Sequence, residues 1–79
     1  MPESRNLASN PNTPPTTLAA LAADANWDVR RAVAGNRSTH PTTLVALAAD
    51  AHGYVRCAVA GNPNTPTWGS IAHAQVTLS

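Results

Sequence analysis

Apolar residues recur along the chain with helical spacing. Leu18, Leu21, Ala22 and Ala25 fall at positions i, i+3, i+4 and i+7, which places them on one face of a helix. Alanine fills most of the positions between them and favours helix formation. The pattern therefore predicts a helix over about residues 14–24, which begins just after a turn rich in asparagine and proline.

A second and shorter apolar stripe follows. Val29, Ala32 and Val33 repeat the i, i+3, i+4 spacing, and Gly35 ends the stripe. This spacing predicts a helix of about two turns, either α or 3₁₀. Because so short a helix is not stable alone, we expect Val29 and Val33 to pack on the preceding helix and on the next unit.

The whole pattern is written twice, with a period of 26 residues. Residues 10–35 and 36–61 align without a gap, and 18 of the 26 positions are identical. Residues 1–9 correspond to the second half of a unit, and residues 62–79 open as a third copy and then diverge. A period of this length is typical of solenoids. We therefore predict one repeat domain over residues 1–79, with half a repeat, two full repeats and a degenerate third repeat or cap.

Polar residues and glycine predict where these helices begin and end. Thr13 is suited to cap the first helix, with Pro14 at its first position, where the missing N–H costs nothing. Asp28 is suited to cap the second helix, and Gly35 can end it by adopting a positive φ. The repeat predicts a twin of the first helix over residues 40–50.

Composition limits the stability and the partners of such a chain. It is 43% hydrophobic, but much of that is alanine and there is no phenylalanine, so we expect an isolated monomer to be marginally stable. The net charge is +1, which predicts no strong attraction to nucleic acid or to an anionic membrane. No apolar run approaches the roughly 18 residues of a membrane span, and no signal peptide is visible. We expect a soluble cytoplasmic protein.

The run "NPNTPPTTLAALAADANWDVRRAVAGN" resembles the variant leucine-rich repeat, whose pattern joins an Asn-Pro-Asn-Thr-Pro turn to Leu-x-x-Leu-Ala-x-Asp and Val-Arg-x-x-Val-Ala. The second copy keeps the helical parts and loses the first proline of the turn and the tryptophan. The resemblance covers about residues 7–66 and extends more loosely to HEAT-like repeats. It implies an all-α, right-handed solenoid of alternating longer α-helices and short α or 3₁₀ helices, without a β-sheet. It also implies an interaction scaffold.

Two acidic and two basic residues recur at the repeat period. Asp24 and Asp50 precede the second helix of each unit, and Arg30 and Arg56 lie on it. A ladder of ion pairs within and between repeats requires such recurrence, so we assign these four residues a structural role. The alternative is a row of arginines that grips an acidic partner or a nucleic-acid backbone.

Four other residues are our candidates for partner contacts. Arg31 and Arg37 do not recur, so they are free of the ladder and can form a small basic surface with Arg5. Trp27 lies beside the predicted start of the second helix. Trp68 lies in the diverged unit, where it either covers the end of the stack or docks a partner.

No arrangement of residues supports catalysis. His40, His52 and His73 lack the spacing of a compact metal-ligand pair. Cys57 is the single cysteine, and no nucleophile signature surrounds it. We therefore predict no catalytic residue, no metal and no cofactor.

The expected function is that of a non-catalytic protein–protein interaction scaffold with a protein partner. Self-association is a further expectation, because the exposed ends of a short repeat array need covering. One alternative is a nucleic-acid-binding solenoid that uses its arginines, and another is an enzyme accessory or metal-binding protein. A third is a remnant or fragment of a longer array with no independent activity.

Overall fold

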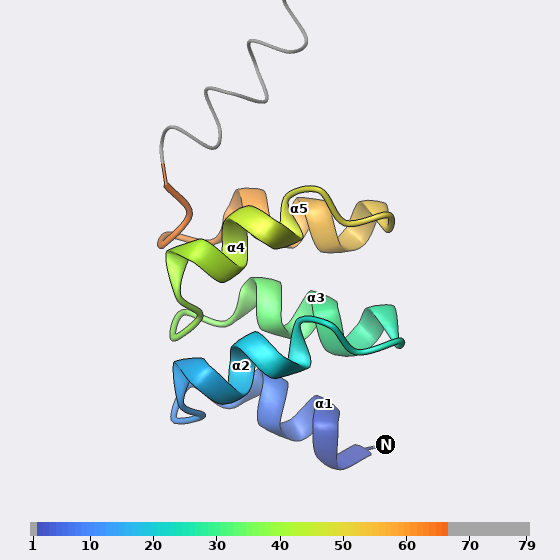
Figure 1. The fold of residues 1–79 in the computed structure, drawn as a ribbon, viewed down its shortest axis with the longest axis vertical. Helices are drawn as coiled ribbons and strands as arrows, with labels where there is room; N and C mark the ends of the chain where they lie inside the picture. The colour runs from blue at the N-terminus through green and yellow to red at the C-terminus, as the bar shows by residue number, and fades with distance from the viewer. Residues whose placement is uncertain (1, 67–79) are drawn as a thin grey trace, which may run out of the picture.

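The computed structural model describes residues 2–66, which form five α-helices and no strand (Figure 1). The all-α helical repeat predicted from the sequence is confirmed over this range. The helices, in chain order, are α1 (Pro2–Ser9), α2 (Pro15–Leu21), α3 (Trp27–Gly35), α4 (Pro41–Leu47) and α5 (Gly53–Gly61). Most of the predicted third repeat, with Trp68 and His73, lies outside the described residues.

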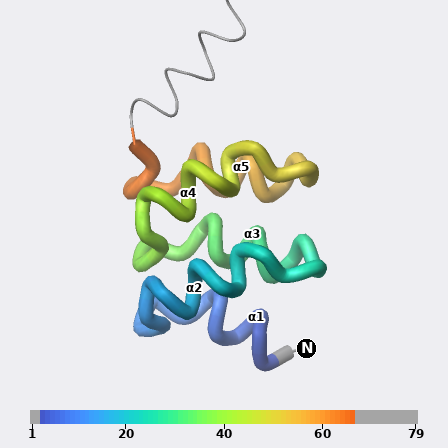
Figure 2. The backbone as a smooth tube through the Cα atoms, in the orientation of Figure 1, coloured from blue at the N-terminus to red at the C-terminus, as the bar shows by residue number. Residues whose placement is uncertain are grey.

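The helices lie in two layers, and the path of the chain repeats itself from one unit to the next (Figures 1 and 2). One layer contains α1, α3 and α5, and α3 packs against both of the others. The second layer contains α2 and α4, which pack on the first layer and barely touch each other. Neighbouring repeats are therefore joined mainly through the layer of α1, α3 and α5.

The relative lengths of the helices differ from the prediction. α2 and α4 have 7 residues each, and α3 and α5 have 9 each, so the helix expected to be longer is the shorter one. After Leu21 the chain makes tight turns, in which the N–H of Asp24 donates to the Leu21 carbonyl at 3.0 Å. Ala25 therefore lies in the loop. The second helix of each unit is α-helical, which decides between the two forms expected for it.

The prediction that Thr13 caps α2 is wrong. Pro14 holds the N-cap position and Pro15 begins the helix. The hydroxyl of Thr13 is buried and donates to the carbonyl of Leu7 at 2.6 Å, so it ties the turn to the preceding helix. The same bond recurs in the later repeats, at Thr39–Val33 (2.6 Å) and Thr65–Val59 (2.5 Å).

The prediction that Asp28 caps α3 is also wrong, by two residues. Asn26 is the N-cap, and its side chain accepts a hydrogen bond from the N–H of Asp28 at 3.0 Å. His52 holds the same place in the next repeat, where its Nδ1 accepts from the N–H of Tyr54 at 3.2 Å. His40 caps α4 in the same way. His40 and His52 do not have the sequence spacing of a compact metal-ligand pair, and the structure shows both as helix caps.

No glycine among residues 2–66 has a positive φ, so the expected left-handed end at Gly35 is wrong. Gly35 and Gly61 are the last residues of α3 and α5. The helices end because Asn36 and Asn62, the next residues, adopt an extended backbone.

The core is a single cluster of buried aliphatic side chains between the two layers. Leu18 from the first stripe and Val29 and Val33 from the second are essentially inaccessible to solvent, as both stripes predict. The remaining members come from equivalent or neighbouring positions: Ala8, Ala34, Leu44, Leu47, Val55 and Val59. The largest of these side chains is leucine, so the core contains no aromatic residue among its buried members.

Candidate functional site

Three aromatic side chains gather where α3 and α5 begin, and we call Trp27, His52 and Tyr54 the aromatic cluster. The rings of Trp27 and His52 stack, with their centroids 4.2 Å apart and their planes within 9°. The ring of Tyr54 is tilted against both, with its centroid 5.6 Å from that of Trp27 and 5.3 Å from that of His52. These distances lie in the range of favourable aromatic pairs.

The repeat stack itself brings these rings together. Trp27 begins α3 and His52 caps α5, and the two helices pack side by side in one layer. The hydrogen bond from the N–H of Tyr54 to His52 Nδ1 helps to fix the orientation of the imidazole. Trp27 is half-buried and packs on the core, whereas Tyr54 is 61% exposed. The cluster is therefore anchored on one side and open to solvent on the other.

Arg31 extends the aromatic cluster along α3. Its guanidinium carbon lies 5.9 Å from the centroid of the Tyr54 ring, at the outer limit of a cation–π contact. Arg31 is exposed, and it also lines a shallow hollow with Arg5, Asp28 and Ala58. Because Arg5 forms an ion pair with Asp28, Arg31 is the arginine of this surface that has no carboxylate partner among residues 2–66.

Of the four residues assigned to an ion-pair ladder, Arg30 and Asp50 meet across the repeat boundary. Arg30 donates from Nε and Nη2 to the two carboxylate oxygens of Asp50, at 2.8 and 3.3 Å. Its Nη1 donates to the carbonyls of Asp24 and Ala25, at 2.8 and 3.1 Å. The side chains of Arg30 and Asp50 are 18% and 9% exposed, so this pair is largely shielded from water.

The pKa of Asp50 is lowered from its ordinary value, chiefly because its carboxylate accepts the hydrogen bond from Arg30. Burial opposes this shift, and the backbone N–H of His52, which donates to the carboxylate at 2.9 Å, adds to it. The same bond to Asp50 raises the pKa of Arg30. The pair is therefore fully ionised at neutral pH.

The other two residues of the expected ladder do not form an equivalent pair. Arg56 donates to the backbone carbonyl of Asp50 at 2.6 Å, and Asp24 accepts from the N–H of Asn26 at 2.8 Å. Ser4 stands 20 residues before Asp24, in the place that Arg30 occupies relative to Asp50. Of the expected ladder, residues 2–66 thus contain one complete rung, the pair of Arg30 and Asp50.

A buried asparagine opens each of the two later turns and joins neighbouring repeats, a role that was not predicted from the sequence. Asn36 is 5% exposed, and its Nδ2 donates to the carbonyls of Ala8 and Asn10 at 2.8 and 2.9 Å. Its Oδ1 accepts from the N–H of Ser38 at 2.8 Å. One asparagine therefore makes three hydrogen bonds and uses both hydrogens of its amide.

Asn62 repeats this arrangement one unit later. Its Nδ2 donates to the carbonyls of Ala34 and Asn36 at 2.8 and 2.9 Å, and its Oδ1 accepts from the N–H of Asn64 at 2.8 Å. We call Asn10, Asn36 and Asn62 the asparagine ladder. The signal in the sequence is that asparagine opens all three copies of the turn.

The remaining candidates lie apart from the aromatic cluster. Arg37 is exposed in the turn after α3, whereas Trp27 is the first residue of that helix. The two residues therefore lie at opposite ends of a helix about 13 Å long. Cys57 is exposed on α5. Within the described residues, no group of three or more His, Cys, Asp and Glu side chains is arranged to hold a metal ion. None of the five helices is long and apolar enough to cross a membrane.

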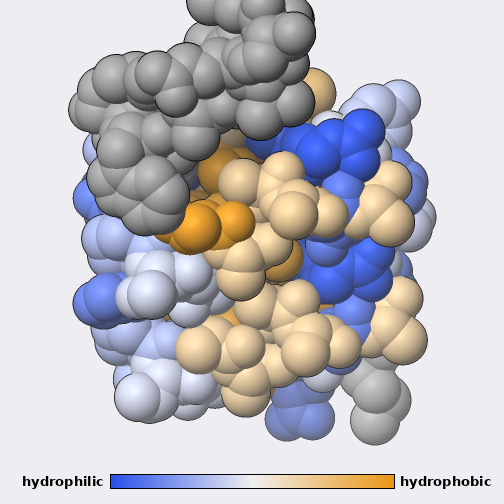
Figure 3. Space-filling view, turned by 45° about the horizontal axis from the view of Figure 1, so that its top comes forward, coloured by the Kyte–Doolittle hydropathy of each residue, from blue (hydrophilic) through white to orange (hydrophobic). Residues whose placement is uncertain are grey.

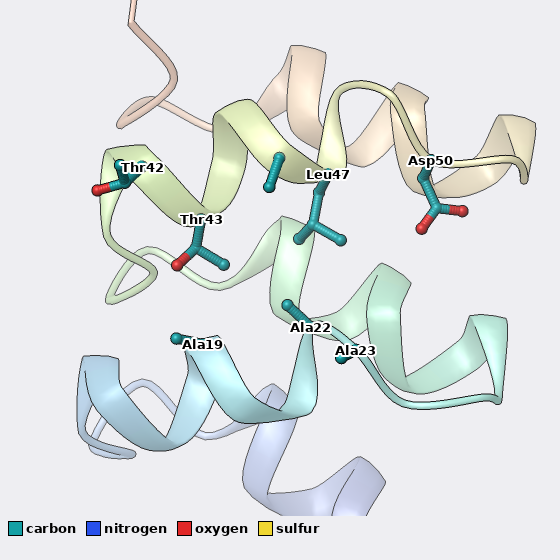
Figure 4. Close-up of a pocket in the computed structure, with 8 residues that line it drawn as sticks. Ala19, Ala22, Ala23, Thr42, Thr43, Leu47 and Asp50 are labelled. Carbon is teal, nitrogen blue, oxygen red and sulfur yellow. The ribbon is translucent and has the colours of Figure 1, made fainter.

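A second shallow hollow lies between α2 and α4, where the two helices part (Figure 4). Small side chains such as those of Ala19, Ala22 and Thr43 line most of it, together with Leu47 and with Asp50 at one end. On the face shown in Figure 3, apolar residues form a central band that polar residues flank on both sides. The carboxylate of Asp50 is already paired with Arg30, so this hollow offers a ligand little beyond methyl groups and threonine hydroxyls.

These features define a helical-repeat protein that has an exposed aromatic edge. Comparison with known families shows which repeat it is: residues 2–49, well over half of the chain, match the Leucine Rich Repeat Variant domain. The chain therefore belongs to the Leucine Rich Repeat Variant family, as the resemblance of its repeats implied. No curated protein and no solved structure matched the chain.

Proposed function

We propose that this chain is a non-catalytic scaffold that binds a protein partner through the aromatic cluster and Arg31. The observation that carries the proposal is the stack of Trp27, His52 and Tyr54 at an exposed edge. Tyrosine, tryptophan and arginine are the residues most enriched at the energetic centres of protein interfaces. Membership of a family of helical repeats supports a scaffold over an enzyme.

The chemistry of this surface favours a particular kind of partner segment. The exposed ring of Tyr54 suits a proline or aliphatic side chain, and proline-rich segments commonly dock on exposed aromatic side chains. Arg31 lies beside them and can form a bidentate ion pair with a carboxylate. We therefore propose an extended segment in which a proline or aliphatic residue lies next to Asp or Glu.

Nucleic acid is not the ligand we propose. The net charge is +1, and Arg5 and Arg30 are each occupied by a carboxylate. A nucleic-acid surface would need several free cations along one face. We place the protein in the cytoplasm, since an exposed free thiol such as that of Cys57 suits a reducing compartment.

Selection from a displayed library of random peptides tests the proposal. The selected peptides should contain the proposed motif and should bind Tyr54→Ala and Arg31→Ala at least tenfold more weakly, about 1.4 kcal/mol. Arg37→Ala is the matched control, because it removes an exposed arginine at the other end of α3. It should bind like the wild type, and circular dichroism should show all variants folded.

Two results would contradict the proposed surface. Peptides that bind Tyr54→Ala as tightly as the wild type would place the binding site elsewhere. A chain that selects no peptide, but binds single-stranded RNA with an affinity that falls steeply with salt, would favour the nucleic-acid alternative.

A further inference from the structure

The N-terminal end of the stack carries an unused copy of the contact that joins the repeats. The Oδ1 of Asn10 accepts from the N–H of Asn12 at 2.9 Å, just as Asn36 Oδ1 accepts from Ser38. The side chain of Asn10 is thus held in the same local turn as its equivalents. Asn10 is exposed, and its Nδ2 donates no hydrogen bond among residues 2–66, whereas Asn36 Nδ2 donates two.

The C-terminal end carries the matching acceptors. The carbonyls of Ala60 and Asn62 are the equivalents of those of Ala34 and Asn36, to which Asn62 Nδ2 donates. Within the described part of the chain, no side chain donates to either of them. The Asn62 carbonyl accepts from the N–H of Thr65 at 3.1 Å, as the Asn36 carbonyl does from Thr39. A carbonyl oxygen has two lone pairs, so the Asn62 carbonyl can still accept the second bond that the Asn36 carbonyl accepts from Asn62 Nδ2.

At each end of the stack, an apolar residue is exposed whose equivalents in the other repeats are buried by the neighbouring repeat. Leu7 is 42% exposed, whereas its equivalents Val33 and Val59 are 0% and 3% exposed. At the other end Ala60 is exposed, whereas its equivalents Ala8 and Ala34 are fully buried. The N-terminal end therefore exposes a larger apolar side chain, and the C-terminal end exposes a small one.

A second polar contact follows the same register. The hydroxyl of Ser38 donates to the carbonyl of Pro11, and Asn64 Nδ2 donates to the carbonyl of Arg37. Asn12 holds the equivalent place at the N-terminal end and is exposed there. The carbonyl of Pro63 is the equivalent of the Pro11 and Arg37 carbonyls, so donors on one end and acceptors on the other match at two positions of the turn, those of Asn10 and Asn12.

We propose that the chain associates head to tail with a second copy of itself, α1 of one copy stacking on α5 of the other in the register of the repeats. Asn10 of one copy then donates to the carbonyls of Ala60 and Asn62 of the other, and Leu7 becomes covered. The layer of α1, α3 and α5 continues through the contact because α1 already belongs to it. The inference rests on the repeat geometry and does not depend on the aromatic cluster.

Two properties of the assembly follow from this geometry. The contact joins two different surfaces, so each copy keeps one free end and further copies can add. Its interface is about one helix face and one turn, which is small for a stable complex, so association should depend on concentration.

Sedimentation equilibrium of the full chain over a wide range of concentrations tests the proposal. The wild type should exceed the monomer mass at high concentration and approach it on dilution. Asn10→Asp keeps the oxygen that accepts from the Asn12 N–H but removes the Nδ2 donor. It also places a carboxylate against the carbonyls of Ala60 and Asn62 of the other copy, so the dissociation constant of the self-association should rise at least tenfold. Asn26→Asp makes the same change at the N-cap of α3, away from both ends, and should associate like the wild type.

A mixing experiment identifies the two surfaces. Ala60→Glu should block the C-terminal end, so this variant alone should also be monomeric. Mixed with Asn10→Asp it should form a one-to-one dimer, because each variant keeps one intact and complementary end. A wild type that is monomeric throughout, an Asn10→Asp variant that associates normally, or a mixture that stays monomeric would each overturn the proposal. Circular dichroism must show both variants folded.

Discussion

Replacing Asn36 by alanine tests whether the asparagine ladder holds the repeats together. Asn36 is 5% exposed, and its side chain lies between the turn that it opens and the end of α1. Alanine removes two bonds to the preceding repeat and one bond within the turn. It also leaves the carbonyl of Ala8 buried without that donor, because the substitution supplies no replacement.

The expected loss follows from the number of bonds. An internal hydrogen bond contributes about 1 kcal/mol net, so three bonds correspond to about 3 kcal/mol of unfolding free energy. A chain of this length is expected to have only about 4–12 kcal/mol in total. The single substitution should therefore remove a quarter or more of the stability, a loss comparable to the lower costs of replacing a buried leucine by alanine.

Asn10→Ala is the matched control, because Asn10 opens the same turn and its Nδ2 donates no hydrogen bond among residues 2–66. It loses the bond to the Asn12 N–H at an exposed position, so we expect a cost below about 1 kcal/mol. Urea denaturation followed by circular dichroism measures both, at a concentration low enough to keep the chains monomeric. Equal losses for Asn36→Ala and Asn10→Ala would refute the role given to the inter-repeat bonds.

Three further predictions address the ion pair and the corrected helix ends. Because Arg30 lowers the pKa of Asp50, the ionised carboxylate stabilises the fold at neutral pH, and this contribution is lost as the pH falls below about 4. The difference in melting temperature between wild type and Asp50→Asn should therefore shrink on acidification, and a constant difference would contradict the assignment. Gly35→Ala should stabilise the chain by about 0.5–1 kcal/mol in urea denaturation, because Gly35 is helical with negative φ and an added Cβ meets no atom within 4 Å. A loss of stability would indicate that the helix has a left-handed end. Thr39→Val should cost about 1 kcal/mol in the same assay, because it removes the buried bond to the Val33 carbonyl, and no loss would mean that this bond contributes nothing.

The period and the apolar stripes were sufficient to predict the helical class and most of the core. Leu18, Val29 and Val33 are buried because a stripe with helical spacing faces the neighbouring helices whatever the details of the turns. The family followed from the same residues, and residues 2–49 match it. These features depend on spacing within one unit, which a single sequence displays.

The helix ends could not be predicted in the same way, because several residues near each end can serve as caps. Thr13 and Asp28 both have the chemistry of an N-cap. Thr13 instead bonds to the carbonyl of Leu7, a partner that the stack places beside it, and Asn26 takes the cap two residues before Asp28. Local propensity does not rank such choices when a tertiary partner decides them.

The aromatic cluster depends on contacts between repeats and was predicted only in part. Trp27 and Arg31 were expected to contact a partner, but His52 and Tyr54 belong to the next unit, and only the packing of α3 on α5 brings them within reach. Arg37, expected on the same surface as Arg31, lies at the other end of α3. Distance along the sequence was therefore a poor guide to which candidates share a surface.

Comparing the two full repeats separates the residues that build the stack from those that form its surface. Most positions whose side chains join or brace the repeats are identical in both copies, including the ladder asparagine and the arginine of the ion pair; 12/38 and 28/54 are exceptions. Their partners are mostly backbone carbonyls, which every repeat supplies whatever its side chains, so the same residue can serve in each copy. Eight positions differ, and four of those lie in or beside the aromatic cluster: 26/52, 27/53, 28/54 and 31/57. A change at these positions leaves the asparagine ladder and the Arg30–Asp50 pair intact, so this edge can diverge while those inter-repeat bonds are kept, as the proposed binding surface would require.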